Sequence, residues 1–442
     1  MSANENVIDV LIHARWIIPV EPDAVVHENH SLAIRAGRIV DLLPRQQAEQ
    51  RYRPAETVEL PRHALIPGLV NAHTHSAMSL MRGLADDLPL MQWLQDNIWP
   101  AEGKHVSAEF CRDGVQLAAA EMLKGGITCF NDMYFFPDVT ARVAAGIGMR
   151  ACVGLILLDF PSAWAQGPDE YLDKGAAVHD AWRDHPLIRT VFGPHAPYTV
   201  SDGPLERVRV LADELDIPIH MHVHETAFEV EQAVALAGRR PLARLHALGL
   251  LTPSLLAVHM TQLTEDEIAL CASTGVQVVH CPESNLKLAS GFCPVRKLLA
   301  AGVNVALGTD GAASNNDLDL LGEMRTAALL GKAVAGDASA LPAYTVLRMA
   351  TLNGAHALGM ADEIGSLEKN KWADLCAIEL DRLESQPLYN ALSQIVYTAS
   401  RHQVSDVWVA GRRLLENRRL TTLDENEVLT RAHDWGRRIA AG

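Results

Sequence analysis

The chain has 442 residues, of which 48% are hydrophobic and 21% are charged, a composition typical of a globular enzyme rather than a disordered protein. It carries 38 Lys and Arg against 54 Asp and Glu, and the resulting net charge of −16 disfavours a nucleic-acid-binding surface. No apolar run reaches the ~18 residues that span a membrane, and the first residues lack the pattern of a signal peptide. Seven scattered Cys without a C-x-x-C pair favour a reducing compartment, so we expect a cytoplasmic protein.

The two ends of the chain share one pattern. Residues 7–66 alternate apolar and polar side chains, as strands with one buried face do, and residues 364–421 repeat this alternation. We therefore expect a β-sandwich lobe built from both termini, residues 1–66 together with 364–421. The last segment, residues 422–442, is expected to form a C-terminal helix with Asp424 as its N-cap.

Eight short apolar runs lie between these ends, separated by segments long enough for a helix. Strand and helix alternating eight times are typical of a (β/α)8 TIM barrel, which we expect over residues 67–363. Ser107–Lys124 is one expected helix, and Pro342–Gly359 is another, packed on the barrel. The eight runs are Leu65–Val70, Ile127–Phe130, Arg150–Leu158, Ile188–Phe192, Ile217–Val223, Leu255–Val258, Val276–Val279 and Val303–Leu307.

Polar side chains follow these runs. A barrel places its active-site residues at the carboxyl ends of its strands, and core packing gives no reason for so many strands to end in His or Asp. These positions are therefore the candidate functional site. They hold His73 and His75; Asn131 and Asp132; Asp159; His195; His222, His224 and Glu225; His259; His280; and Asp310.

Part of this set has the composition of a metal site. His73 and His75 follow the first run two residues apart, so the strand period directs both imidazoles to the same side. The first and eighth strands of a closed barrel are neighbours, which lets Asp310 approach both. Three imidazoles and a carboxylate suit Zn²⁺ or Fe²⁺, with an open position for a water molecule whose pKa zinc lowers to about 7. The spacing leaves three candidates for the third imidazole: His220, His222 and His224.

The segments PGLVNAHTHSAM, HMHVHE and LGTDGAASNN resemble the amidohydrolase superfamily of metal hydrolases, in an order that holds from about residue 7 to about residue 421. The resemblance implies that the metal ligands are His73, His75, His222 and Asp310. Many members carry a lysine on strand four that bridges two metals, but strand four here, RTVFGPHAP, has none. We therefore expect one divalent metal ion, Zn²⁺ before Fe²⁺ or Mn²⁺.

Within this superfamily the chain is similar to the 5′-methylthioadenosine/S-adenosylhomocysteine deaminases, on the segments MQWLQDNIWPAE, GPHAPYTV and HETAFE. The similarity implies hydrolytic deamination of the adenine ring of 5′-methylthioadenosine, S-adenosylhomocysteine or adenosine, giving the hypoxanthine nucleoside and ammonia. It also implies that Glu102 holds the ribose hydroxyls, that His195 contacts the substrate, that Glu225 protonates the purine ring, and that His259 lies beside the metal-bound water.

The chemistry accounts for these residue types. Attack at C6 of adenine needs a hydroxide and a proton on ring N1. Glu225 is placed to supply this proton. Asp310, as ligand and base in contact with the substrate, and His259 would carry a proton from the water to the departing ammonia. A carboxylate can accept two O–H bonds from a cis-diol, which fits Glu102. His280 is either a substrate contact or a structural hydrogen-bonding group.

Other interpretations stay open. Glu102 could be a first-turn helix acid, His195 a turn residue, and Glu225 a group that orients a histidine ligand. The same barrel could act on guanine, a pterin or a chlorinated triazine, although a ribose contact at Glu102 favours a nucleoside. A non-catalytic scaffold of this fold is disfavoured because all four ligands are present. An RNA base deaminase is disfavoured by the charge and by the lack of an H-x-E…P-C-x-x-C pattern.

Some members supply an arginine from the strand-three region to bind a carboxylate. Residues 151–182 contain no Arg, and Arg150 lies at the start of the strand, at the wrong end of the barrel. We therefore expect a preference for 5′-methylthioadenosine over S-adenosylhomocysteine. We also expect a homo-oligomer, as is common for enzymes of this kind.

Overall fold

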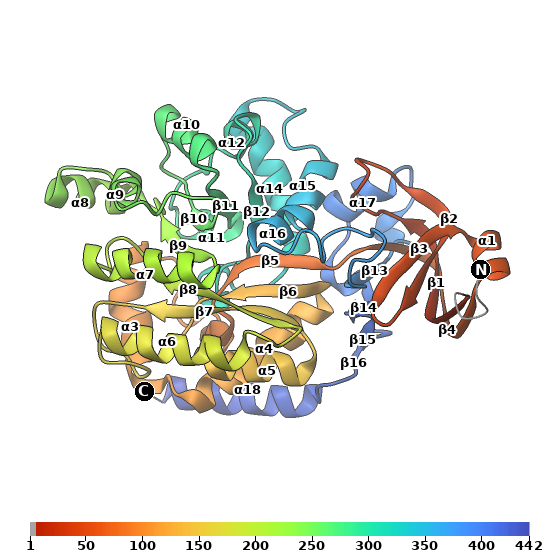
Figure 1. The fold of residues 1–442 in the computed structure, drawn as a ribbon, viewed down its shortest axis with the longest axis horizontal. Coiled ribbons are helices and arrows are strands. Elements are labelled where there is room, and N and C mark those ends of the chain that lie inside the picture. The colour runs from red at the N-terminus through yellow and green to blue at the C-terminus, as the bar shows by residue number, and fades with distance from the viewer. Residues whose placement is uncertain (1–5, 442) are drawn as a thin grey trace.

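The computed structural model describes residues 6–441, which form a barrel and a second β-sheet (Figure 1). The barrel sheet contains eight parallel strands in the order β5 to β12, and helices surround it. The expected (β/α)8 barrel with a separate terminal sheet is thus confirmed. The barrel strands are β5 (Leu69–Thr74), β6 (Ile127–Asp132), β7 (Arg150–Leu157), β8 (Ile188–Pro194), β9 (Ile219–Val223), β10 (Leu255–His259), β11 (Gln277–His280) and β12 (Val305–Leu307).

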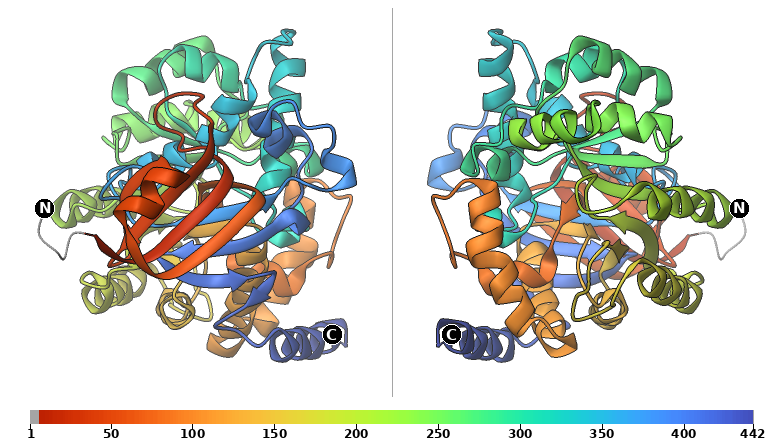
Figure 2. Two further views of the ribbon diagram at one scale, coloured as in Figure 1. Left: turned by 90° about the vertical axis from the view of Figure 1, so that its right-hand side faces the viewer. Right: turned by 90° about the vertical axis from the view of Figure 1, so that its left-hand side faces the viewer.

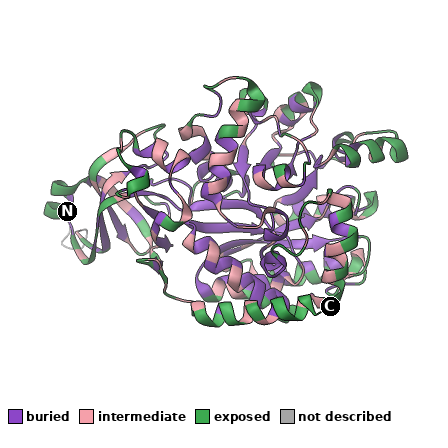
Figure 3. Ribbon diagram, turned by 180° about the vertical axis from the view of Figure 1, so that it is seen from behind, coloured by how far each residue is buried: buried purple, intermediate pink, exposed green. Residues whose placement is uncertain are grey.

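The barrel closes between its first and last strands. β12 lies against β5, and the backbone N–H of Asp310 donates to the carbonyl oxygen of His73 over 3.0 Å. Seven of the eight barrel strands are buried along their whole length and β8 at all but Arg189, whereas the surrounding helices expose their outer faces (Figure 3). Closure therefore brings the ends of the first and eighth strands together at one face.

The first predicted strand, Leu65–Val70, is wrong because it joins the end of one strand to the start of another. β4 (Arg53–Pro67) ends in the terminal sheet, and the chain enters the barrel at Gly68, whose N–H donates to the carbonyl oxygen of Asp374 over 2.8 Å. A Cβ atom on Gly68 would lie 2.1 Å from the hydroxyl oxygen of Thr128, so only glycine permits this approach. The other seven predicted runs each overlap one barrel strand.

The second sheet joins the two ends of the chain, as the left view of Figure 2 shows. Its order is β16-β15-β14-β13-β4-β1-β2-β3, and β13 pairs antiparallel with β4. The sheet is curled, which brings the β2–β3 turn against the residue pair that precedes β13. There the carbonyl oxygen of Gly37 accepts the N–H of Ala373 over 2.9 Å. The strands are β1 (Val7–Ile17), β2 (His27–Arg35), β3 (Arg38–Pro44), β4, β13 (Leu375–Glu379), β14 (Val404–Val409), β15 (Arg412–Glu416) and β16 (Arg419–Leu420). The boundaries expected for the domains stay predictions.

Helices follow the barrel strands along the chain. Ser107 caps the expected helix after the first strand by accepting the N–H of Phe110 over 3.2 Å, and Asp424 caps the last helix in the same way. Among the described helices, none has the length and apolar character needed to cross a bilayer. The helices are α1 (Arg45–Arg51), η1 (Ser76–Met81), α2 (Leu90–Trp93), η2 (Leu94–Ile98), α3 (Trp99–His105), α4 (Ala108–Lys124), α5 (Pro137–Ile147), α6 (Pro168–Trp182), α7 (Asp202–Leu215), α8 (Ala227–Ala237), α9 (Pro241–Ala247), α10 (Glu265–Thr274), α11 (Pro282–Lys287), α12 (Val295–Ala300), α13 (Ala312–Asn315), α14 (Leu320–Ala335), α15 (Ala343–Met349), α16 (Leu352–Ala357), η3 (Leu383–Ser385), α17 (Ala391–Tyr397), η4 (Arg401–Gln403) and α18 (Glu425–Ala440).

The single helix expected over Pro342–Gly359 is wrong, because this segment forms two short helices, α15 and α16. The break lies at Thr351, whose hydroxyl bonds to the carbonyl oxygen of Leu347 over 2.7 Å. The carbonyl oxygen of Ala350 accepts the N–H of Val70 from β5 over 2.8 Å instead of continuing the helix. Contact with the barrel therefore overrides the helical pattern of the sequence.

Candidate active site

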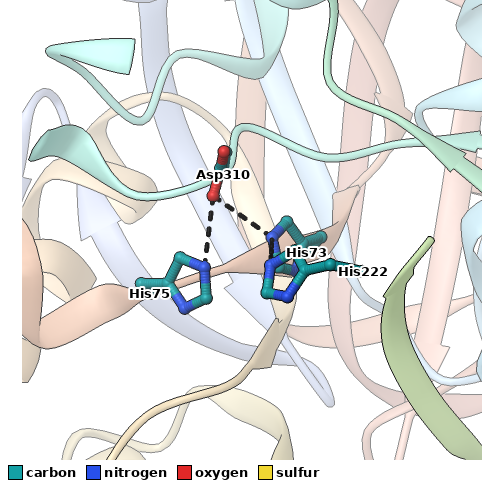
Figure 4. A group of neighbouring side chains, drawn as sticks. All are labelled: His73, His75, His222 and Asp310. Carbon is teal, nitrogen blue, oxygen red and sulfur yellow. Dashed lines mark hydrogen bonds and ion pairs between the residues drawn. The ribbon is translucent and has the colours of Figure 1, made fainter. Parts of the chain in front are cut away.

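Four side chains converge at the carboxyl ends of the barrel strands (Figure 4). The Nε2 atoms of His73 and His75 lie 3.2 and 3.3 Å from Oδ1 of Asp310. Nε2 of His222 lies 3.3 Å from Nε2 of His73. One ligand atom from each of the four residues lies within 4.8 Å of the others. Strands β5, β9 and β12 thus bring residues separated by more than 200 positions to one point.

The remaining ring nitrogens of two of these histidines bond to backbone oxygens. Nδ1 of His75 lies 2.5 Å from the carbonyl oxygen of Met133, and Nδ1 of His222 lies 2.7 Å from that of His195. A carbonyl oxygen only accepts, so each Nδ1 carries the proton and each Nε2 presents its lone pair to the cluster. Three imidazoles and one carboxylate are ligands that a borderline divalent cation takes, so the composition of the cluster suits a divalent metal ion.

The two other histidines of β9 and its end lie elsewhere. Nε2 of His220 lies 2.9 Å from Nδ1 of His73, on the side of that ring away from the cluster. Nε2 of His224 accepts the backbone N–H of Leu242 over 3.1 Å. Of these three histidines, only His222 directs its Nε2 into the cluster, while His220 contacts the ring of His73 from behind.

The carboxylate of Asp310 is held on both oxygens. Oδ1 accepts the N–H of Gly311 over 2.8 Å, in addition to its contacts with the histidines. Oδ2 accepts the hydroxyls of Ser284 over 2.6 Å and Ser314 over 3.1 Å. Asp310 also has a φ of 61°, a left-handed conformation that a non-glycine residue adopts only where its surroundings enforce it.

Three residues of the cluster, His75, His222 and Asp310, line a pocket that encloses about 890 Å³, including its open mouth. One wall is apolar and comes from the segment between the first strand and α4: Leu90, Trp93, Leu94, Ile98 and Trp99. Eight further lining side chains carry polar groups: Glu102, Tyr134, His195, Tyr198, Thr199, Glu225, His259 and Ser314. Within the described part of the chain, no Lys or Arg lines this pocket.

Glu225 and His259 lie together beside the cluster. Oε2 of Glu225 lies 3.8 Å from Nε2 of His259, and burial raises the pKa of Glu225 above its usual range. Nδ1 of His259 lies 2.8 Å from Oδ1 of Asn285, so Nδ1 carries the proton and the lone pair of Nε2 faces the pocket. A carboxyl group with a raised pKa and an imidazole whose Nε2 can accept a proton therefore lie side by side in the pocket.

Glu102 lies in the first turn of α3, as the alternative of a first-turn helix acid requires, and it also lines the pocket. Burial raises its pKa to about 7, although the hydroxyl of Tyr134, 2.7 Å from Oε1, favours the ionised form. His195 also lines the pocket, and its Nδ1 lies 3.0 Å from the hydroxyl of Thr199. Burial lowers the pKa of His195 to about 3, so its ring is neutral.

The other polar strand ends do not line this pocket. Asn131 donates to the carbonyl oxygen of Ala72 over 3.0 Å, and the carboxylates of Asp132 and Asp159 accept backbone N–H groups over 2.7 and 2.9 Å. These side chains therefore form hydrogen bonds to backbone groups around the pocket. His280 is buried at the end of β11 outside the pocket lining, so its expected contact with substrate stays a prediction.

Sequence reasoning missed the residues that hold the predicted ones in place. They are Tyr134, Thr199, Ser284, Asn285 and Ser314. The first four lie two to five positions after the end of a barrel strand, and Ser314 lies four positions after Asp310. Hydroxyl and amide side chains at such positions are the only signal that the sequence offered.

A sequence profile described as the amidohydrolase family matches residues 64–414. The chain belongs to the amidohydrolase family. This amidohydrolase is 51% identical over 438 residues to a 5-methylthioadenosine/S-adenosylhomocysteine deaminase of Teredinibacter turnerae, with 99% of each chain covered. It is 52% identical to a protein of the same name from Saccharophagus degradans, covering 99% of this chain and 98% of the other.

Among solved structures, this amidohydrolase is similar to an adenosine deaminase from Xanthomonas campestris with bound zinc. The TM-score is 0.98 and the identity 57%, over 99% of this chain and 100% of the other. A guanine deaminase from C. acetobutylicum has a TM-score of 0.81 at 21% identity, over 91% of this chain and 99% of the other. A triazine hydrolase variant has a TM-score of 0.90 at 23% identity, over 96% and 99%. At these identities, the similarity of this chain to the guanine deaminase and the triazine hydrolase shows a common fold and nothing more.

Proposed function

We propose that this amidohydrolase removes the 6-amino group of adenine nucleosides by hydrolysis, giving the hypoxanthine nucleoside and ammonia. The observation that carries the proposal is that Glu102, a carboxylate suited to a ribose diol, and Glu225, a buried carboxyl group whose pKa burial raises, line one pocket with His75, His222 and Asp310 of the cluster. Relatives at 51–57% identity that carry deaminase names support it.

The cluster would hold one zinc ion, which when bound acidifies a water molecule at neutral pH. In the proposed reaction the carboxyl group of Glu225 donates its proton to ring N1, which relieves the negative charge that attack at C6 would place there. Nε2 of His259 and the carboxylate of Asp310 accept a proton from water. As the C6–N bond breaks, one water proton leaves on ammonia, and the other replaces the proton that Glu225 gave to N1.

The lining of the pocket supports a preference among 5′ groups. Without a Lys or Arg among its described lining residues, it offers no cationic partner for a phosphate or an amino-acid carboxylate, and the ionised form of Glu102 would repel such groups. The apolar wall that includes Trp93, Leu94 and Trp99 suits a methylthio group. We therefore propose 5′-methylthioadenosine as the preferred substrate, before S-adenosylhomocysteine.

The test is an ultraviolet assay of adenine-to-hypoxanthine conversion with the zinc-loaded protein. 5′-Methylthioadenosine, adenosine and S-adenosylhomocysteine are compared with adenine and guanine as controls. Turnover of nucleosides but not of bases is expected, with kcat/KM highest for 5′-methylthioadenosine. Silence on all three nucleosides with metal bound would contradict the deaminase function, whereas a preference for S-adenosylhomocysteine would contradict only the 5′ assignment.

Three further expectations have direct measurements. Elemental analysis of the protein as isolated should find one metal ion per chain, zinc rather than iron or manganese. Light scattering should find a homo-oligomer. Cell fractionation should find the protein in the cytoplasm.

A further inference from the structure

The turn that carries Glu225 has a strained backbone. His224 follows β9 and has a φ of 54°, in the left-handed region that side chains other than glycine rarely adopt. Such a conformation persists only when surrounding contacts determine it. The direction of the Glu225 side chain depends on this turn, because the two residues are adjacent.

A buried carboxylate on α8 holds the turn. Oε1 of Glu229 accepts the backbone N–H of His224 over 3.2 Å, and Oε2 accepts the N–H of Glu225 over 2.7 Å. The side chain of Glu229 is only 7% exposed. Its own N–H donates to the hydroxyl of Thr226, the N-cap of α8, over 3.2 Å, which fixes the first turn of the helix against the strand.

The opposite side of the turn is held by the strand next to β9. The hydroxyl of Thr261, two residues past β10, donates to the carbonyl oxygen of Glu225 over 2.6 Å. The backbone N–H of Thr261 donates to the carbonyl oxygen of His224 over 3.0 Å. The backbone of Glu225 is thus bonded on its N–H by Glu229 and on its carbonyl by Thr261, and its side chain is left to line the pocket.

We propose that Glu229 is a positioning residue for the deamination, acting through Glu225; this inference rests on the proposed function. Two backbone N–H groups need two acceptors, and a carboxylate supplies them. A glutamine at the same place supplies one acceptor and sets its NH₂ group against the second N–H, which leaves a buried donor unpaired. Glu229 itself is absent from the pocket lining within the described chain, so it acts only through the turn.

The test compares Glu229→Gln with Glu231→Gln, which makes the same change at an exposed position of α8. Both variants are expected to bind one metal ion per chain and to unfold within a few degrees of the wild type. Glu229→Gln should lower kcat about 10- to 100-fold with KM within about threefold, because a misplacement of about 1 Å at a reacting group costs on the order of 100-fold. Glu231→Gln should keep the wild-type kcat.

A double variant separates positioning from a general structural role. If Glu229 acts through Glu225, then Glu229→Gln should change the residual kcat of the Glu225→Gln enzyme by less than about twofold. Full multiplication of the two effects, loss of metal, or an unchanged kcat in Glu229→Gln would each overturn the inference. An inactive wild type would instead contradict the proposed function, and the inference would fall with it.

Discussion

The phenolic hydroxyl of Tyr134 donates a hydrogen bond of 2.7 Å to Oε1 of Glu102. Tyr134 follows β6 and Glu102 lies in α3, so the bond joins the barrel to the segment that covers the pocket. Replacing Tyr134 with Phe removes a donor that favours the ionised carboxylate. We expect KM for nucleosides to rise roughly tenfold, about 1.4 kcal/mol, with kcat within about twofold. Steady-state kinetics at pH 7 measure this, and the same substitution in a Glu102→Gln background should have no effect.

Binding of nucleosides should depend on pH through Glu102. Burial raises the pKa of this carboxyl group to about 7, so its ionised fraction increases as pH rises through neutrality. Only the ionised form accepts O–H groups from a ribose on both oxygens. The Kd of an unreactive purine nucleoside should therefore fall roughly tenfold from pH 6 to pH 8. Titration calorimetry measures it; a Kd that is constant over this range, or equally pH-dependent in Glu102→Gln, would contradict the assignment.

Metal affinity should distinguish the two histidines that flank the ligand on β9. His220 contacts His73 from behind, so His220→Gln should weaken zinc binding about 10- to 100-fold, whereas His224→Gln should leave zinc affinity unchanged. Competition with a chromogenic chelator measures both constants. Full removal of the metal by chelation should abolish turnover and lower the Tm, and added zinc should restore both. Equal affinities in the two variants would remove His220 from this role.

A buried ion pair connects the barrel to the terminal sheet. Nε and Nη2 of Arg150, at the start of β7, lie 2.9 and 3.1 Å from the two carboxylate oxygens of Asp374, which precedes β13. Arg150→Met leaves that carboxylate buried and unpaired, at a cost of about 3–5 kcal/mol in the free energy of unfolding. Arg142→Met breaks an exposed pair on α5 and should cost less than about 0.5 kcal/mol. Urea denaturation compares the two, and similar losses would contradict the prediction.

The sequence carried enough to predict the barrel, because strands buried on both faces leave continuous apolar runs. It could not place the boundary between β4 and β5, since Leu65 and Ile66 are as apolar as Leu69 and Val70 although they belong to different sheets. That boundary depends on the close approach of Gly68 to Thr128, a contact across the fold.

The candidate site, like the fold, could be predicted from the sequence only in part. Several polar residues that line the pocket lie at strand ends and were predicted from that position, His195 and Glu225 among them, whereas Glu102 lies in α3 and was predicted only from the resemblance. The groups that orient site residues were not predicted. The carbonyl oxygen of Met133 meets His75 only through a tertiary contact, and Glu229, although close to Glu225 in the sequence, gave no sign that its carboxylate turns back onto the preceding turn. Spacing also left His220, His222 and His224 equivalent, and the structure separates them by what the Nε2 atom of each contacts.

The order of strands in the terminal sheet has a consequence for synthesis on the ribosome. β4 pairs on one edge with β1, which precedes it, and on the other with β13, which the ribosome makes roughly 300 residues later. At roughly 5–20 residues per second, that edge stays unpaired for about 15–60 s. An open, largely apolar strand edge is a template for pairing with other chains. The nascent protein is thus most exposed to aggregation while its barrel is being made, and slower translation of that region lengthens the exposure.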